Sequence, residues 1–434
     1  MNWKKQYADK IRTPKEAASI VQDEDRVYIG TCTSVARTLA RALGDRAEEL
    51  RDVWIGSSNV MDDLIVMKTP EHFHVSTYYM GPGERKAYAM NNCSFTSVHL
   101  SELDLWFKKT FRPNVSFIEV SEPDAQGRVS LGPSGVGMHV SAMRYSDCVI
   151  LEINPNVPYV YGDEALFPLE KAECIVEGDD LIPEVDDLPP SEDVCRISEY
   201  IVSKVPDGSC IQLGIGGIGH AVGYGLREKN DLGIHTEAFT NSMAFLVKNG
   251  NVTNSRKSFC PGKSTASFAL GTKSLYDFLD HNENVYFTAF STGNDPRVIC
   301  RNDHMISINS CISIDLYGQV ASDNINGRQF SAVGGQVDFV RGAQMSRGGK
   351  SFIAATSVNI SRKTGKKTSR IVSRLAPGTV VTTSRADVNY IVTEHGAVDL
   401  RPLDMRDRAH ALILLADPEF RPMLIEDAKK MGIY

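Results

Sequence analysis

Residues 210–237 read CIQLGIGGIGHAVGYGLREKNDLGIHTE, and this stretch decides the fold. The apolar run 210–213 predicts a buried strand, the glycine-rich turn after it leads into a helix over 220–227, and 232–235 predicts the next strand. This β-α-β order is typical of a parallel sheet. Ligands bind such sheets at the carboxyl ends of the strands, and Glu237 stands just after one of those ends. The stretch therefore predicts an α/β fold with a ligand site near Glu237.

The same order of elements occurs near the start of the chain. From Thr13 to Ile55 the pattern again predicts a helix, an acidic turn, a strand, a small-residue turn, a helix and a strand. Acidic residues and prolines accumulate over 182–190, as in an exposed linker between domains. We therefore expect two open-sheet α/β domains of similar topology, over residues 1–185 and 186–434.

The composition favours a protein that acts on a small ligand. Asp and Glu number 54 and Lys and Arg 47, and this net charge of −7 argues against nucleic acid or an anionic membrane as the main partner. No apolar run approaches the roughly 18 to 20 residues that span a bilayer, and the first ten residues lack the apolar segment of a signal peptide, so we expect a cytoplasmic location. The nine cysteines show no metal-binding spacing, which indicates buried thiols and no metal site.

The glycine-rich turn allows a second interpretation. Gly214, Gly216 and Gly219 match the GxGxxG pattern, and Glu237 lies at about the distance at which nicotinamide enzymes place the acid that binds the ribose. The pattern alone is a weak signal, and the strand after the turn continues Thr-Glu-Ala-Phe. A nicotinamide-binding protein therefore stays open at this point.

Three other features also have a structural and a functional interpretation. His235 is either a catalytic partner of Glu237 or a core histidine. Gly334 and Gly335 either permit close packing or present two N–H groups to a ligand. The basic run 362–367 is either a solvated hairpin tip or a phosphate site.

Four motifs together resemble the acetyl-CoA hydrolase/transferase family. They are LGIGGI at 213–218, GIHTE at 233–237, FSAVGGQVDF at 330–339 and VTEHG at 392–396. The resemblance covers nearly the whole chain and implies two α/β domains in a homodimer or larger homo-oligomer. It implies transfer of CoA between a short-chain acyl-CoA (acetyl-, butyryl- or 4-hydroxybutyryl-CoA) and a free carboxylate such as acetate. CoA is then a substrate, and no tightly bound cofactor is expected.

The resemblance also implies roles for individual residues. Glu237 matches the nucleophile that forms a glutamyl-CoA thioester, and Glu394 matches a second active-site glutamate. Asn294 and Gly335 match the donors that hold an oxyanion. The expected CoA-binding positions are Gly214, Ile215, Gly216, Gly217, Ile218, Gly334 and Gly335. The chemistry needs an ionised Glu237, and the dipole of the helix after the glycine loop is expected to help.

The sequence departs from the family pattern at three places, which leaves the acyl specificity open. Ala332 replaces a frequent glycine, His395 a frequent tyrosine, and residues 238–242 a segment that more often carries Ser-Asp-Gly. A hydrolase would use the same Glu237 but admit water. A nicotinamide oxidoreductase would leave the motif at 330–339 unexplained, and a catalytically silent CoA-binding regulator would not need both glutamates.

Overall fold

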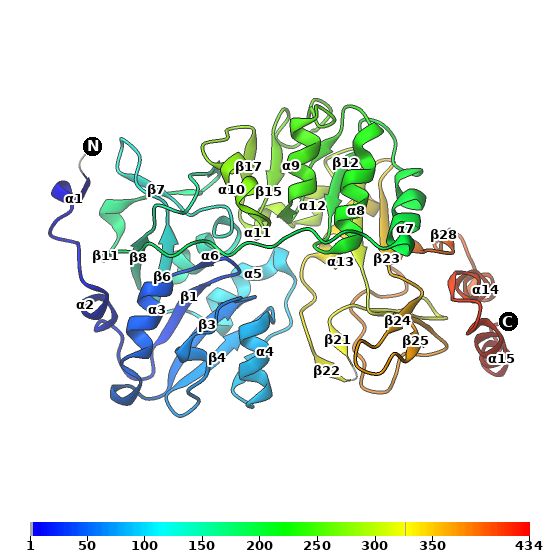
Figure 1. The fold of residues 1–434 in the computed structure, drawn as a ribbon, viewed down its shortest axis with the longest axis horizontal. Coiled ribbons are helices and arrows are strands. Elements are labelled where there is room, and N and C mark those ends of the chain that lie inside the picture. The colour runs from blue at the N-terminus through cyan, green and yellow to red at the C-terminus, as the bar shows by residue number, and fades with distance from the viewer. Residues whose placement is uncertain (1–2, 326) are drawn as a thin grey trace. The chain divides into compact units, whose positions relative to one another are not determined.

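The computed structural model describes residues 3–325 and 327–434 (Figure 1). The chain divides into two compact units, the first formed by Met1–Asp186 and Thr265–Gly293, the second by Asp187–Ser264 and Asn294–Tyr434. The sequence predicts a continuous second domain, whereas the structure places Thr265–Gly293 in the first unit. The physical reason is long-range strand pairing, because β17 (Val285–Phe287) pairs in parallel with β9 (Tyr161–Gly162).

The first unit is built on an open sheet with the strand order β11-β8-β6-β1-β3-β4-β5, in which the neighbours in this order run parallel. Its strands are β1 (Arg26–Thr31), β3 (Val53–Ser58), β4 (Phe73–Thr77), β5 (Cys93–Phe95), β6 (Val115–Val120), β8 (Cys148–Ile153) and β11 (Cys174–Glu177), with β2 (Ser34–Val35) antiparallel to β1. The main helices are α2 (Pro14–Ala18), α3 (Arg37–Gly44), α4 (Pro82–Ala89), α6 (Val136–Tyr145) and α10 (Lys273–Leu279). Leu39 and Leu43, one turn apart on α3, are fully buried in the core beside Ile29 and Ile55 of the sheet.

The second unit has a sheet with the order β13-β12-β18-β23-β27-β28, parallel except for the antiparallel pair β27 and β28. Its strands are β12 (Cys210–Leu213), β13 (Gly233–Ile234), β18 (Met305–Ser310), β23 (Lys350–Ala354), β27 (Tyr390–Thr393) and β28 (Gly396–Asp399). Its main helices are α7 (Glu192–Val202), α8 (Gly217–Gly225), α9 (Asn241–Lys248), α12 (Pro296–Ile299), α13 (Gln336–Met345), α14 (Met405–Leu415) and α15 (Arg421–Lys430).

The two sheets share one topological feature. In the first sheet β1 lies between β3 and the later strand β6. In the second sheet β12 lies between β13 and the later strand β18. The strand order reverses beside such a strand, and ligands bind α/β proteins at this place. The predicted α/β class with two open sheets is therefore confirmed, and the glycine loop after β12 lies at the switch point of its sheet.

Several predicted helix ends agree with their caps, and others differ. The sequence of residues 13–16 predicts a capping box and a helix that runs to about Val21. Thr13 and Glu16 form this capping box, but α2 ends at Ala18. The sequence predicts a loop at Gly81-Pro82-Gly83. In the structure α4 begins there, because Pro82 occupies the first turn and the Glu84 carboxylate accepts the Gly81 N–H at 2.9 Å.

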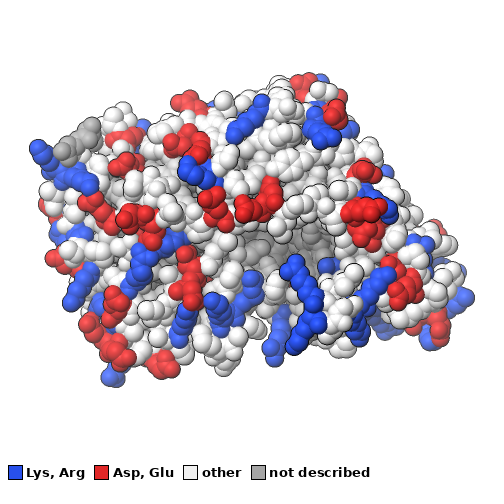
Figure 2. All heavy atoms as spheres, viewed as in Figure 1, with Lys and Arg blue, Asp and Glu red and all other residues white. Residues whose placement is uncertain are grey.

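The surface carries mixed charge, and the thiols are unbridged. On the face in Figure 2, Lys and Arg side chains are interspersed with Asp and Glu, so the net charge of −7 is not gathered there in one patch. None of the nine cysteines, all of which lie in the described part of the chain, forms a disulfide. Within residues 3–325 and 327–434, each helix is too short or too polar to cross a bilayer.

Candidate active site

The glycine loop between β12 and α8 folds as a close turn against its own helix. Gly216 has a φ of +117°, a value that favours glycine, and it directly precedes α8. A Cβ on Gly219 would lie 1.9 Å from the Gly214 carbonyl oxygen, so the helix approaches the loop more closely than a side chain allows. The Ile215 side chain at the tip is 41% exposed. Of the predicted CoA-binding residues, 214–216 thus form a loop at the switch point with an accessible apolar tip, and Gly217 and Ile218 begin α8.

Glu237 lies just after β13 and is held by two donors. The Asn294 amide Nδ2 donates to Glu237 Oε2 at 2.9 Å, and the backbone N–H of Gly335 also hydrogen-bonds the carboxylate. Asn294 is fully buried, whereas Glu237 remains partly exposed. The structure therefore brings together three of the four predicted catalytic residues.

Gly335 can lie this close to Glu237 and Asn294 because it has no side chain. A Cβ there would lie 1.9 Å from Glu237 Oε2 and 2.2 Å from Asn294 Nδ2. Gly334 before it has a φ of +59°, and α13 begins directly after Gly335. The diglycine therefore turns the chain and delivers an N–H group to the carboxylate, which answers the question left open by the sequence.

The pKa of Glu237 is raised to about 7, chiefly because burial disfavours the charged form. The Asp338 carboxylate raises it as well, while the Asn294 amide and the Gly335 N–H lower it. The hydrogen bonds that favour the anion thus come from Asn294 and Gly335. Near neutral pH, Glu237 is present in both protonation states.

Glu394, the fourth predicted catalytic residue, has a different set of partners. Its carboxylate accepts the Ser357 backbone N–H at 2.8 and 3.1 Å and the Ser357 hydroxyl. His395 Nε2 lies 3.5 Å from Glu394 Oε1. The structure therefore places Glu394 at the end of β27 in a contact with Ser357 and not among the donors of Glu237.

The structure also decides two other open features. His235 has no exposed surface, lies between Phe259 and Phe339, and its Nδ1 is 3.3 Å from Asn302 Nδ2, so it is a core histidine. The basic run 362–367 lies at the turn between the antiparallel strands β24 (Val358–Ile360) and β25 (Lys367–Ser369), and its last residue begins β25, as expected of a hairpin tip.

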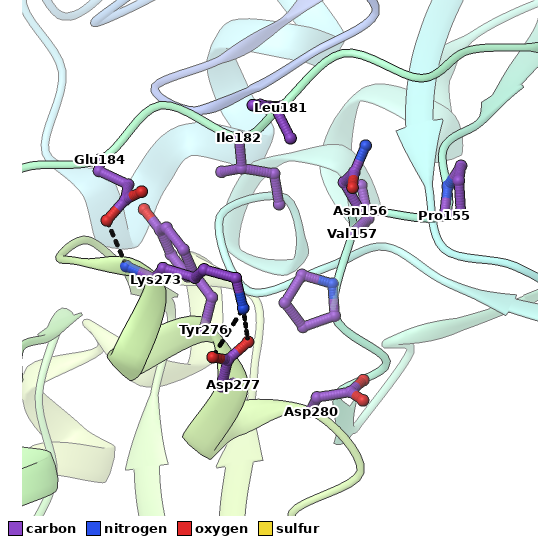
Figure 3. A pocket seen from close by; sticks show the side chains of 11 residues that line it. Pro155, Asn156, Val157, Leu181, Ile182, Glu184, Lys273, Tyr276, Asp277 and Asp280 are labelled. Carbon is purple, nitrogen blue, oxygen red and sulfur yellow. Dashed lines mark hydrogen bonds and ion pairs between the residues drawn. The ribbon is translucent and has the colours of Figure 1, made fainter.

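A separate cavity of about 490 Å³ opens in the first unit (Figure 3). The Lys273 ammonium on its wall pairs with Asp277 at 2.7 Å, and the Lys273 backbone N–H donates to Glu184 at 2.6 Å. With Asp280, three carboxylates face a single cation. This charge balance opposes an anionic ligand such as the phosphates of CoA, and none of the predicted site residues lines the cavity.

Sequence reasoning missed Asp338 although the residue belongs to a quoted motif. The signal was an acidic residue in the first turn of a helix, which by itself predicts only a favourable helix-dipole contact. Its influence on Glu237 depends on the way in which α13 and the end of β13 pack together, and local sequence carries no trace of that packing.

Known proteins resemble the chain over its full length. Residues 1–186 match the acetyl-CoA hydrolase/transferase N-terminal domain and residues 271–428 the C-terminal domain. Butyryl-CoA:acetate CoA-transferase of Anaerostipes caccae is 36% identical, covering 100% of this chain and 99% of the relative. 4-Hydroxybutyrate coenzyme A transferase of Clostridium kluyveri is 37% identical, covering 99% and 100%.

The same holds for solved structures. RipA from Yersinia pestis superposes with a TM-score of 0.94 at 32% identity and 100% coverage of both chains. The predicted family resemblance is confirmed by these matches. The chain therefore belongs to the acetyl-CoA hydrolase/transferase family and is a CoA-transferase-family enzyme.

Proposed function

We propose that this enzyme moves CoA from a short-chain acyl-CoA to a free carboxylate through a glutamyl-CoA thioester on Glu237. The relatives from Anaerostipes caccae and Clostridium kluyveri bear the names of butyrate, acetate and 4-hydroxybutyrate transferases, which supports this substrate class. The observation that carries the proposal is the Glu237 carboxylate held by the Asn294 amide and the Gly335 N–H, on a residue that is only partly buried.

The first half-reaction transfers CoA to the enzyme. The ionised Glu237 attacks the thioester carbonyl, the C–S bond breaks, and a mixed anhydride and CoA thiolate result. The thiolate then attacks the glutamyl carbonyl of the anhydride, which forms the glutamyl-CoA thioester and releases the first carboxylate. An acceptor carboxylate reverses both steps, so the thioester bond is conserved without ATP.

The two donors suit the steps that occur at the glutamyl carbonyl. When the thiolate or the acceptor acid attacks this carbon, negative charge develops on a Glu237 oxygen. Asn294 Nδ2 is already 2.9 Å from Oε2, and the Gly335 N–H contacts the same carboxylate. Preorganised donors of this kind contribute about 3 kcal/mol each to transition-state stabilisation.

The remaining residues take supporting roles in the proposal. Residues 214–218 and Gly334 contact CoA, for which the exposed loop at the switch point is suited. Glu394 is the second active-site glutamate in this proposal, and the hydrogen bond from the Ser357 N–H holds its carboxylate. By analogy with the family, we also propose a homodimer or larger homo-oligomer in the cytoplasm.

The partition between transfer and hydrolysis tests the proposal. Butyryl-CoA is incubated with labelled acetate, and labelled acetyl-CoA and free CoA are quantified by chromatography. We expect labelled acetyl-CoA as the main product and none from Glu237→Gln, whose amide cannot act as the nucleophile. Free CoA as the main product, at a rate independent of acetate, would identify a hydrolase. Undiminished acetyl-CoA formation by Glu237→Gln would remove Glu237 from the mechanism.

A further inference from the structure

β13, which leads into Glu237, lies at one edge of its sheet. On its inner side, Gly233 N–H donates to the Ser209 carbonyl at 2.9 Å and His235 N–H to the Ile211 carbonyl at 3.1 Å. The N–H and C=O of the intervening Ile234 point to the opposite side because successive residues of a strand alternate. Ile234 is fully buried, so these two groups need partners other than water.

Two side chains supply those partners. Asn254 Oδ1 accepts the Ile234 N–H at 2.9 Å, and Lys257 Nζ donates to the Ile234 carbonyl at 2.6 Å. Both side chains also form hydrogen bonds within their own loop. Asn254 Nδ2 donates to Ser264 Oγ at 3.1 Å, and Lys257 Nζ donates to the Lys263 carbonyl oxygen at 2.7 Å. Asn254 and Lys257 thus take the place of a neighbouring strand.

Lys257 is not a solvated surface charge. Its side chain is 5% exposed, and its stem lies over Gly233, where a Cβ would be 2.7 Å from Lys257 Cγ. Burial lowers the pKa of Lys257 to about 8. Burying an ammonium group is unfavourable unless its hydrogen bonds are replaced, and here the two carbonyl oxygens replace them.

We propose that Asn254 and Lys257 are positioning residues that hold Glu237 against Asn294 and Gly335, an inference that rests on the proposed role of Glu237 as nucleophile. Ile234 stands three positions before Glu237, and the donors come from other elements, so a shift of β13 changes the Glu237–Asn294 distance directly. Loosening β13 therefore weakens both hydrogen bonds to the carboxylate. Because these bonds lower the pKa of Glu237, their loss raises it.

Two variants test the inference. Lys257→Met removes the donor to Ile234 while keeping an apolar stem, and Asn254→Gly removes the acceptor while tolerating the φ of +55° at this position. For both we expect kcat to fall about tenfold to hundredfold, with a smaller change in KM for acyl-CoA. The acid limb of the pH profile, which is the fall of kcat/KM at low pH, moves to higher pH, because the pKa of Glu237 rises when its hydrogen-bond donors are lost.

Two control variants separate positioning from stability. Asn254→Asp keeps the acceptor for Ile234 and tolerates the positive φ. Lys350→Met removes a comparable bond elsewhere in the sheet, from Lys350 Nζ to the Lys204 carbonyl at 2.8 Å. We expect both to keep the wild-type kcat and acid limb, even where the melting temperature falls.

The outcomes distinguish this inference from the proposed function. Wild-type kcat and acid limb in folded Lys257→Met and Asn254→Gly overturn the inference, and so does an equal loss of kcat in Lys350→Met. If Lys257→Met does not fold, Asn254→Gly alone decides, and failure of both to fold also overturns the inference. Glu237→Gln is assayed in parallel, because activity in that variant contradicts the proposed function instead.

Discussion

Gly335→Ala would place a Cβ atom against the Glu237 carboxylate, at a distance that the structure defines. The added Cβ would lie 1.9 Å from Glu237 Oε2, and real Cβ atoms essentially never approach a neighbour within 3.0 Å. The carboxylate must therefore retreat by about 1 Å, a displacement that costs on the order of a hundredfold in rate when it affects a reacting group. We expect kcat for CoA transfer to fall about a hundredfold. The pKa of Glu237 rises because the contacts with Asn294 and Gly335 lengthen.

Steady-state kinetics with an acyl-CoA and acetate, together with a thermal unfolding curve, measure both effects. Gly342→Ala is the matched control, because Gly342 lies in α13, the helix that Gly335 precedes, and its added Cβ would lie 2.5 Å from the Ile299 side chain of α12. Crowding of this kind reduces stability by about 1 to 3 kcal/mol and leaves Glu237 in place, so kcat is retained. A folded Gly335→Ala enzyme with a kcat within about threefold of wild type refutes the reasoning.

Three further predictions concern the pH dependence and the glycine loop. Since the nucleophile must be ionised and burial raises the pKa of Glu237 to about 7, kcat/KM falls about tenfold per unit below pH 7, and a midpoint near 4.5 contradicts this. Asp338→Asn removes a charge that raises the pKa of Glu237, so the acid limb moves to lower pH, and a move upward argues against the assigned contact. In Gly219→Ala the Cβ meets the Gly214 carbonyl oxygen at 1.9 Å and opens the loop, so KM for acyl-CoA rises more than kcat falls; an unchanged KM would separate the loop from CoA.

Local signals in the sequence were enough for much of the second sheet. The apolar run of β12 and the glycines of the turn after it are properties of the local sequence, and the structure has a strand and a close turn at these places. The prediction of a loop at Gly81-Pro82-Gly83 was wrong, because Gly81 has no side chain that would mark it as the cap of a helix. There the Glu84 carboxylate accepts the Gly81 backbone N–H, which is the half of a capping box that needs no side chain on the capping residue.

Contacts between distant residues could not be predicted in this way. Asn294 is 57 positions from Glu237, and the two were connected only through the family resemblance. The return of Thr265–Gly293 to the first unit depends on the pairing of β17 with β9. The roles of Asn254 and Lys257 follow from the buried edge of β13, a property of the folded sheet.

Trapping the covalent intermediate tests the central claim most directly. The enzyme is incubated with butyryl-CoA in the absence of an acceptor acid, treated with borohydride, digested and analysed by mass spectrometry. Reduction of a glutamyl-CoA thioester leaves an alcohol, so the peptide that contains Glu237 is predicted to lose one oxygen and gain two hydrogens, only when butyryl-CoA was present. An unmodified Glu237 peptide, from enzyme that still consumes butyryl-CoA under the same conditions, contradicts the glutamyl-CoA mechanism.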